Sequence, residues 1–179
     1  MLSAENSLVL CIDIQDKLVA ALNKNTIVSN AVKIISAANI LDIPVLVTEQ
    51  YPKGLGNTVE PLKSVLSVDS EVVEKTYFNA LLEDGMLEKI KSYDKKQIVI
   101  FGIETHICVH QTASALVEEG FEVYVIKDAC ASREKYEFKA GLETMKQNGV
   151  RISCVEIALF EWLKGAKHPK FKEVQALIK

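Results

Sequence analysis

The chain has 179 residues, of which 49% are hydrophobic and 25% are charged, and its formal net charge is -3. This composition fits one globular domain over residues 1–179, and the slightly acidic balance without a dense Lys/Arg run argues against nucleic-acid or anionic-membrane partners. No apolar run approaches membrane-spanning length, and the first residues lack the character of a secretory or transit peptide, so we expect a cytoplasmic protein.

Short apolar runs alternate with longer helical patterns along the chain. The apolar runs predict strands over residues 8–13, 45–48, 72–75, 98–103, 123–127 and 150–155. Helical spacing of apolar residues predicts helices over 26–41, 80–92, 106–119 and 169–178. Alternation of this kind is typical of α/β proteins, and continuous Val/Ile/Leu runs indicate strands that are buried on both faces. We therefore expect a three-layer α/β/α sandwich around a six-stranded, mostly parallel sheet.

One turn-rich segment, residues 49–57, directly follows the second predicted strand. In an α/β protein this position lies at the edge of the sheet where ligands bind. The segment is therefore predicted to shape a pocket.

The four cysteines are Cys11, Cys108, Cys130 and Cys154, and no two of them form a Cys-x-x-Cys pair. This scatter argues against a disulfide framework or a structural zinc site, so reduced thiols are expected. Cys11 and Cys154 fall inside apolar strand runs, where they are predicted to pack as small core residues. Cys108 differs, because it lies in the first turn of a helix that follows a strand, and a helix N-terminus favours thiolate over thiol.

Two further residues are expected near Cys108. Asp13 ends the first predicted strand and Lys75 ends the third, and the carboxyl ends of parallel strands share one edge of the sheet. A cysteine that attacks a carbonyl needs a base and a positive charge. Asp13 is the predicted base and Lys75 the predicted cation, although each residue taken singly could be a helix cap or a solvated charge.

Four sequence segments resemble the isochorismatase-like cysteine hydrolase superfamily, which includes nicotinamidases and N-carbamoyl amide hydrolases. These segments are 48–56, the Lys75-Thr76 pair, 102–106, and Asp128-Ala129 followed by Ser132-Arg133. The resemblance implies the three-layer fold, an Asp13, Lys75, Cys108 triad and a homo-oligomer.

The same resemblance implies how an oxyanion is held. A cis peptide bond between Ile103 and Glu104 turns the Glu104 amide toward the oxyanion, and the Cys108 amide is the second donor. The residues predicted to contact a small-molecule substrate are Gln15, Tyr51, Tyr77, Ile103 and His106. Gln15 has three open roles, because it could orient the acid, touch the substrate or face solvent at a helix start.

The chain departs from the metal-dependent nicotinamidases, which place Asp-x-His after the second strand. This chain has Thr48, Glu49, Gln50 and Tyr51 there, and it has no histidine before His106. His106 and His110 are one helical turn apart, as in some zinc-binding helices, but no carboxylate ligand is evident nearby in the sequence. We therefore expect neither a metal nor another cofactor.

These observations predict a metal-independent cysteine hydrolase that cleaves a small amide, carbamoyl or related acyl compound through a thioester intermediate. The alternative is a scaffold or ligand-binding protein that retains the pocket without turnover. A nuclease role has little support from an acidic chain without a basic stripe.

Overall fold

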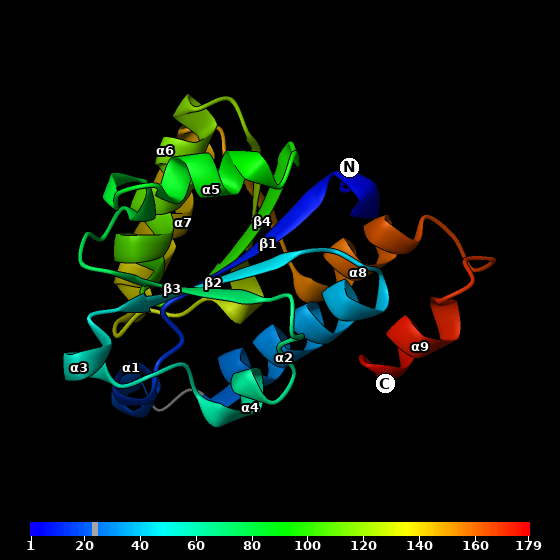
Figure 1. The fold of residues 1–179 in the computed structure, drawn as a ribbon, viewed down its shortest axis with the longest axis horizontal. Helices are drawn as coiled ribbons and strands as arrows, with labels where there is room; N and C mark the ends of the chain where they lie inside the picture. The colour runs from blue at the N-terminus through cyan, green and yellow to red at the C-terminus, as the bar shows by residue number, and fades with distance from the viewer. Residues whose placement is uncertain (23–24) are drawn as a thin grey trace.

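A six-stranded sheet forms the middle layer of the molecule (Figure 1), and the structure, a computed structural model, describes residues 1–22 and 25–179. All neighbouring strands in it run parallel. The strand order is β3-β2-β1-β4-β5-β6, which confirms the predicted α/β class. The strands are β1 (Ser7–Ile12), β2 (Val45–Gln50), β3 (Glu71–Lys75), β4 (Gln97–Gly102), β5 (Glu122–Ile126) and β6 (Arg151–Ser153).

The strand order reverses in the centre of the sheet. The chain builds outward from β1 through β2 to β3, and then returns to place β4 on the other side of β1. A crevice outside the carboxyl ends of β1 and β4 follows from this topology, and such crevices are where open α/β sheets bind ligands. Asp13 directly follows β1 at this point, and Gly102 ends β4.

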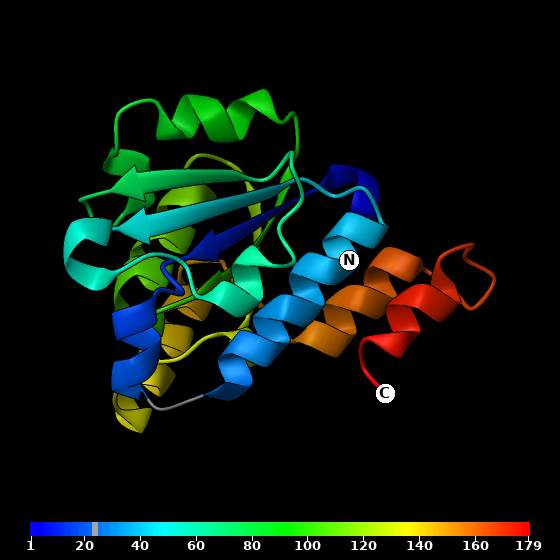
Figure 2. The same cartoon turned by 60° about the horizontal axis from the view of Figure 1, so that its bottom comes forward.

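Helices cover both faces of the sheet and complete the three layers. One face carries α2, α8 and α9, which lie side by side in Figure 2, and the other carries α5, α6 and α7. The helices are α1 (Asp16–Leu22), α2 (Asn25–Ile40), α3 (Pro52–Leu55), α4 (Glu60–Lys63), α5 (Met86–Ser92), α6 (His110–Glu118), α7 (Lys135–Gln147), α8 (Val155–Leu163) and α9 (Phe171–Ala176). In the described part of the chain, no helix has both the length and the apolar character needed to cross a membrane.

The predicted helix over residues 80–92 is broken into two pieces. A single 3-10 turn covers Ala80–Leu82, and the α-helix begins only at Met86. The Asn79 side chain caps the 3-10 turn by accepting a hydrogen bond from the Leu81 N–H, as expected at a helix start. The break lies further on, because Gly85 adopts a φ of 76°. A residue in this left-handed conformation does not continue a right-handed helix.

The prediction that Cys154 lies inside a strand is wrong. The last strand ends at Ser153, and Cys154 precedes α8 with a partly exposed side chain. Cys11 is fully buried in β1, as predicted. The structure pairs none of the four cysteines, which are all free thiols.

The ends of β1 and β4 approach each other so closely that only glycine fits at residue 102. A Cβ atom on Gly102 would lie 1.9 Å from the Ile12 carbonyl oxygen, and the φ of this residue is 141°. This contact fixes where the chain leaves β4 and enters the turn that carries Cys108.

Candidate active site

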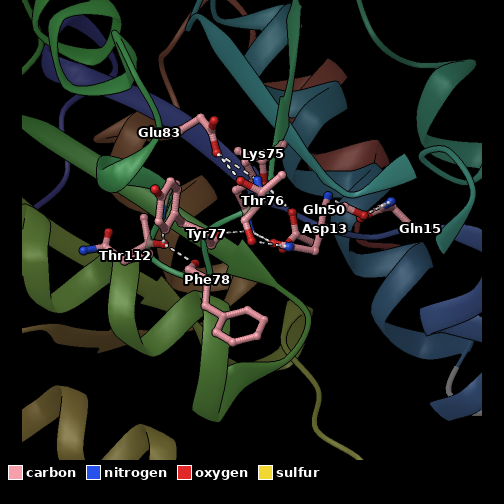
Figure 3. A network of polar contacts seen from close by, with 12 residues as sticks. Asp13, Gln15, Gln50, Lys75, Thr76, Tyr77, Phe78, Glu83 and Thr112 are labelled. Carbon is pink, nitrogen blue, oxygen red and sulfur yellow. Dashed lines mark hydrogen bonds and ion pairs between the residues drawn. The ribbon is translucent and has the colours of Figure 1, made fainter. Parts of the chain in front are cut away.

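A buried ion pair lies at the carboxyl edge of the sheet. The Lys75 Nζ atom is 2.8 Å from the Asp13 Oδ2 atom, and both side chains are 0% exposed. Lys75 is the last residue of β3, while Asp13 follows β1 in a left-handed conformation with a φ of 51°. Thr48, on the intervening strand β2, donates a hydrogen bond of 2.6 Å from Oγ1 to Asp13 Oδ1. The two predicted charges therefore meet across three strand ends (Figure 3).

Burying this ion pair costs desolvation free energy. Removing two charges from water costs free energy that their attraction returns only if the geometry is good and the remaining polar atoms are satisfied. The carboxylate has partners on both oxygens, Lys75 on one and Thr48 on the other. A charged pair that is kept so far from solvent is typical of a functional site.

Cys108 is the third member of the group. It lies in a π-helical turn, Thr105–Val109, that opens into α6, and only 7% of the residue is exposed. The pKa of the Cys108 thiol is raised to about 12. Burial is the largest cause, the Asp13 carboxylate adds to it, and the Lys75 ammonium opposes both. The expectation of a lowered pKa from the helix N-terminus is therefore not met, because desolvation of the thiolate outweighs the nearby positive charges. Cys108 rests as a thiol beside a carboxylate.

The turn between β4 and Cys108 has an unusual backbone. The peptide bond between Ile103 and Glu104 is cis. The flanking amides are used, since Ile103 N–H donates to the Ile12 carbonyl and Thr105 N–H to the Ala131 carbonyl. Among the described residues, no acceptor is found for the Glu104 N–H, so this donor remains available at the start of the turn.

Three side chains on the outer side of this turn could together ligate a cation. Ligand atoms of Glu104, His106 and Glu137 lie within 4.8 Å of one another, so the expectation that His106 has no carboxylate nearby is wrong. α7 brings Glu137 close to His106, and this proximity could not be predicted because the two residues are far apart along the chain. Each group is already engaged: Glu104 accepts from Arg133, Glu137 lies near His106 and helps cap α7, and His106 Nδ1 is 2.9 Å from a serine hydroxyl.

The remaining residues that were predicted to contact substrate fall into two groups. Gln15 and Ile103 are fully buried. Tyr51 and Tyr77 are more than half exposed. Tyr51 also lines a cavity of about 290 Å³, whose walls are Tyr51, Pro52, Lys53, Glu74, Lys75, Thr76 and Glu83. The turn-rich segment predicted to shape a pocket therefore contributes to a cavity beside Lys75.

Sequence reasoning did not name Gln50 as a site residue. Its side-chain Oε1 atom accepts a hydrogen bond of 2.7 Å from Lys75 Nζ. The signal that could have found it is its place at the end of β2, because Gln50 is the register partner of Lys75 in the parallel sheet.

Two residues of the segment in which metal-dependent nicotinamidases carry their Asp-x-His motif, Glu49 and Gln50, are hydrogen-bonded within the protein. Glu49 is buried and its Oε1 atom accepts a hydrogen bond of 2.6 Å from the Thr58 N–H. Gln50 contacts Lys75. These side chains support the site and the loop beside it.

Residues 7–157 match the family model of the isochorismatase domain. The chain is similar to isochorismatase domain-containing protein 1 of Danio rerio, with 36% identity over 179 residues that cover 99% of this chain and 62% of the fish protein. The chain thus spans less than two thirds of the length of that relative.

Solved structures share the fold. The MAR1 ribonuclease of Caenorhabditis elegans superimposes with a TM-score of 0.93 at 35% identity, covering 99% of this chain and 91% of the other. The YcaC gene product of Escherichia coli, an octameric hydrolase of unknown specificity, gives a TM-score of 0.88 at 22% identity, covering 99% and 94%. The second likeness, at this low identity, concerns the fold alone.

Proposed function

The chain belongs to the isochorismatase family of hydrolases, and we propose that it is a metal-independent cysteine hydrolase of a small amide, carbamoyl or related acyl compound. The observation that carries this proposal is the meeting of Asp13, Lys75 and Cys108 at one sheet edge. A thiol, a carboxylate and an ammonium in contact are the groups that acyl transfer to sulfur requires.

In the first step, the Asp13 carboxylate takes the proton of the Cys108 thiol as the sulfur attacks the carbonyl carbon of the substrate. The carbonyl π bond becomes a lone pair on oxygen, and the Glu104 and Cys108 amides donate hydrogen bonds to that oxyanion. The Lys75 ammonium remains beside the now neutral Asp13, where it stabilises the negative charge that has moved onto the substrate.

In the second step, the oxyanion re-forms the carbonyl and the carbon–nitrogen bond breaks. The departing amine takes the proton from Asp13. The acyl group then remains on Cys108 as a thioester. Water then attacks the thioester while Asp13 accepts a water proton, and collapse returns that proton to sulfur and releases the acid. No metal takes part in these reaction steps. In keeping with this, Glu49 and Gln50 form hydrogen bonds with other groups of the protein.

The raised pKa of the Cys108 thiol supports a base-assisted attack. A thiol with a pKa of about 12 carries almost no thiolate at pH 7, so its nucleophilicity depends on proton transfer within the site. Asp13 is the group placed to accept that proton. The buried setting also strengthens the electrostatic interactions that act on the transition state.

A homo-oligomer is part of the same proposal. Exposed aromatic and aliphatic side chains, Tyr51, Tyr77, Phe78 and Leu82, lie in the segments around the site. A second copy that covers them would also narrow access to the cavity beside Lys75.

The test is hydrolysis of a panel of small amides, ureido compounds and esters by the wild-type protein and by Cys108→Ser. We expect the variant to lose at least about 10³-fold in kcat/KM, and a slow substrate to leave its acyl mass on Cys108 in the wild type. Cys154→Ser is the matched control and retains activity, because Cys154 lies away from the ion pair.

Two results would contradict the proposed activity and favour another function. Absence of turnover and of any Cys108 adduct across the panel would favour the alternative, a binding or scaffold protein. Cleavage of RNA that Cys108→Ser abolishes would instead extend to this chain the activity that the name of the nematode relative states.

A further inference from the structure

The side-chain amide of Gln50 lies between two groups, one on the last residue of β3 and one on the residue that follows the strand. Its Oε1 atom accepts from Lys75 Nζ at 2.7 Å, and its Nε2 atom donates to the Thr76 carbonyl at 2.7 Å (Figure 3). We propose that Gln50 is a positioning residue that holds the Lys75 ammonium in place for the reaction. This inference rests on the proposed function, to which it adds a residue that does not itself touch the substrate.

The sheet register brings Gln50 to this position. β2 and β3 are parallel, and Gln50 and Lys75 are the last register partners of the two strands. Side chains of register partners leave the same face of a sheet and lie within contact distance. The contact between the amide and the ammonium is therefore built into the strand pairing and needs no loop rearrangement.

The chemistry of the two neighbours fixes the orientation of the amide. An ammonium group only donates hydrogen bonds and a carbonyl oxygen only accepts them. The Gln50 oxygen must face Lys75 and its nitrogen must face Thr76, since the flipped amide would bring two donors together and two acceptors together. Thr76 is held in turn, because its backbone N–H donates to Glu83 Oε2 at 2.8 Å.

The backbone of Gln50 is clamped by a second glutamine. Gln50 N–H donates to Gln15 Oε1 at 2.7 Å, and Gln15 Nε2 donates to the Gln50 carbonyl at 3.0 Å. Gln15 Nε2 also donates to the Gly56 carbonyl at 2.6 Å. Gln15 is fully buried, so this side chain works as a brace that ties the end of β2 to the following loop.

The Lys75 ammonium is held by three oxygen atoms. It donates hydrogen bonds to Gln50 Oε1 at 2.7 Å and to the Tyr77 carbonyl at 3.1 Å, and it forms an ion pair with Asp13 Oδ2 at 2.8 Å. The Cys108 thiol faces the same ammonium. Asp13 takes part in the reaction and the Tyr77 carbonyl belongs to the main chain. Gln50 is therefore the acceptor that can be substituted without removing a reacting group. A substitution at Gln50 changes the hydrogen bonding of the Lys75 ammonium and leaves Asp13 in place.

Two substitutions at Gln50 have opposite expected effects on the pH dependence. Gln50→Met keeps the volume but removes an acceptor that favours the charged ammonium, so the basic limb of the pH–rate profile moves to lower pH. Gln50→Glu places a carboxylate at Lys75 and moves that limb to higher pH. For Gln50→Met we expect kcat to fall about tenfold with KM unchanged within about twofold, because one hydrogen bond to a charged group is lost.

The control is Gln147→Met, which makes the same exchange at an exposed residue at the end of α7 and leaves rate and profile unchanged. If both Gln50 variants lost activity while the basic limb stayed in place, Gln50 would have only a structural role and the inference would be overturned.

Lysine ammonium NMR on protein labelled with ¹⁵N-lysine tests the inference without turnover. A buried ammonium with two hydrogen-bond acceptors and a paired carboxylate exchanges its protons slowly, so wild type should show a Lys75 signal that Gln50→Met loses and Gln147→Met keeps. A signal that persists unchanged in Gln50→Met would overturn the inference even in an active enzyme. Loss of the signal in a protein that hydrolyses nothing would support the role of Gln50 and reject the proposed function.

Discussion

Ion pairs at the two ends of the sheet have similar geometry but different surroundings. At the carboxyl end, Lys75 and Asp13 are 2.8 Å apart and both side chains are 0% exposed. At the amino end, where β5 and β6 begin, Arg151 and Glu122 are 2.6 Å apart with 52% and 47% exposure. The shorter contact is the weaker one, because water screens an exposed pair and an exposed partner can be rehydrated. Burial, and not distance, separates the ion pair of the proposed active site from the surface pair.

The largest expected effect is on catalysis at the carboxyl end. Asp13→Asn keeps the shape of the side chain but removes the base, and kcat/KM should fall on the order of 10⁴-fold. The same substitution removes a negative charge that raises the pKa of Cys108, so iodoacetamide should alkylate Cys108 faster than in wild type at pH 8. Steady-state kinetics and mass spectrometry of the labelled peptide measure both.

These two readouts move in opposite directions only if Asp13 is both the base and a neighbour of the thiol. A variant that lost hydrolysis and also labelled more slowly would point to a disturbed fold, and circular dichroism would reveal it. If hydrolysis were unchanged, Asp13 would not be the base.

The next effect is on stability. Lys75→Met leaves the Asp13 carboxylate buried without its cation, and the free energy of unfolding should fall by about 3–5 kcal/mol. Urea unfolding at fixed protein concentration measures the change. The double variant Asp13→Asn, Lys75→Met should recover much of the loss, because no uncompensated charge is then buried. A loss below about 1 kcal/mol in the single variant would place this pair with ordinary surface pairs.

The smallest effect is expected at the amino end. Hydrogen bonds from Arg151 and then Gln97 lower the pKa of the Glu122 carboxyl, so its contribution to stability is present above about pH 4.5 and is lost as the pH falls further. Glu122→Gln should cost no more than about 1 kcal/mol at pH 7, since the pair is half exposed. Unfolding at pH 7 and pH 3 tests this, because the difference between wild type and variant should be smaller at the lower pH.

Strand positions and strand-end residues could be predicted from the sequence. A parallel strand that is buried on both faces must be apolar along most of its length, so β1, β2, β4 and β5 stood out as apolar runs. The polar residues at strand ends indicated the edge of the sheet where ligands bind. Asp13, Lys75 and the turn before Cys108 were found in this way. The helix predicted over residues 80–92 is interrupted, because the left-handed Gly85 separates the 3-10 turn Ala80–Leu82 from α5 despite good helix-forming residues.

The sequence by itself determined the α/β class, the order of its elements and the residue types that face the crevice, because periodicity and local propensity are properties of neighbouring residues. Only the tertiary structure decided that Gln50 faces Lys75 and that Glu137 lies near His106. It also decided that Cys108 has a raised pKa. These features depend on strand register, on helix packing and on how far each group is removed from water, and those quantities are set by segments that are distant along the chain.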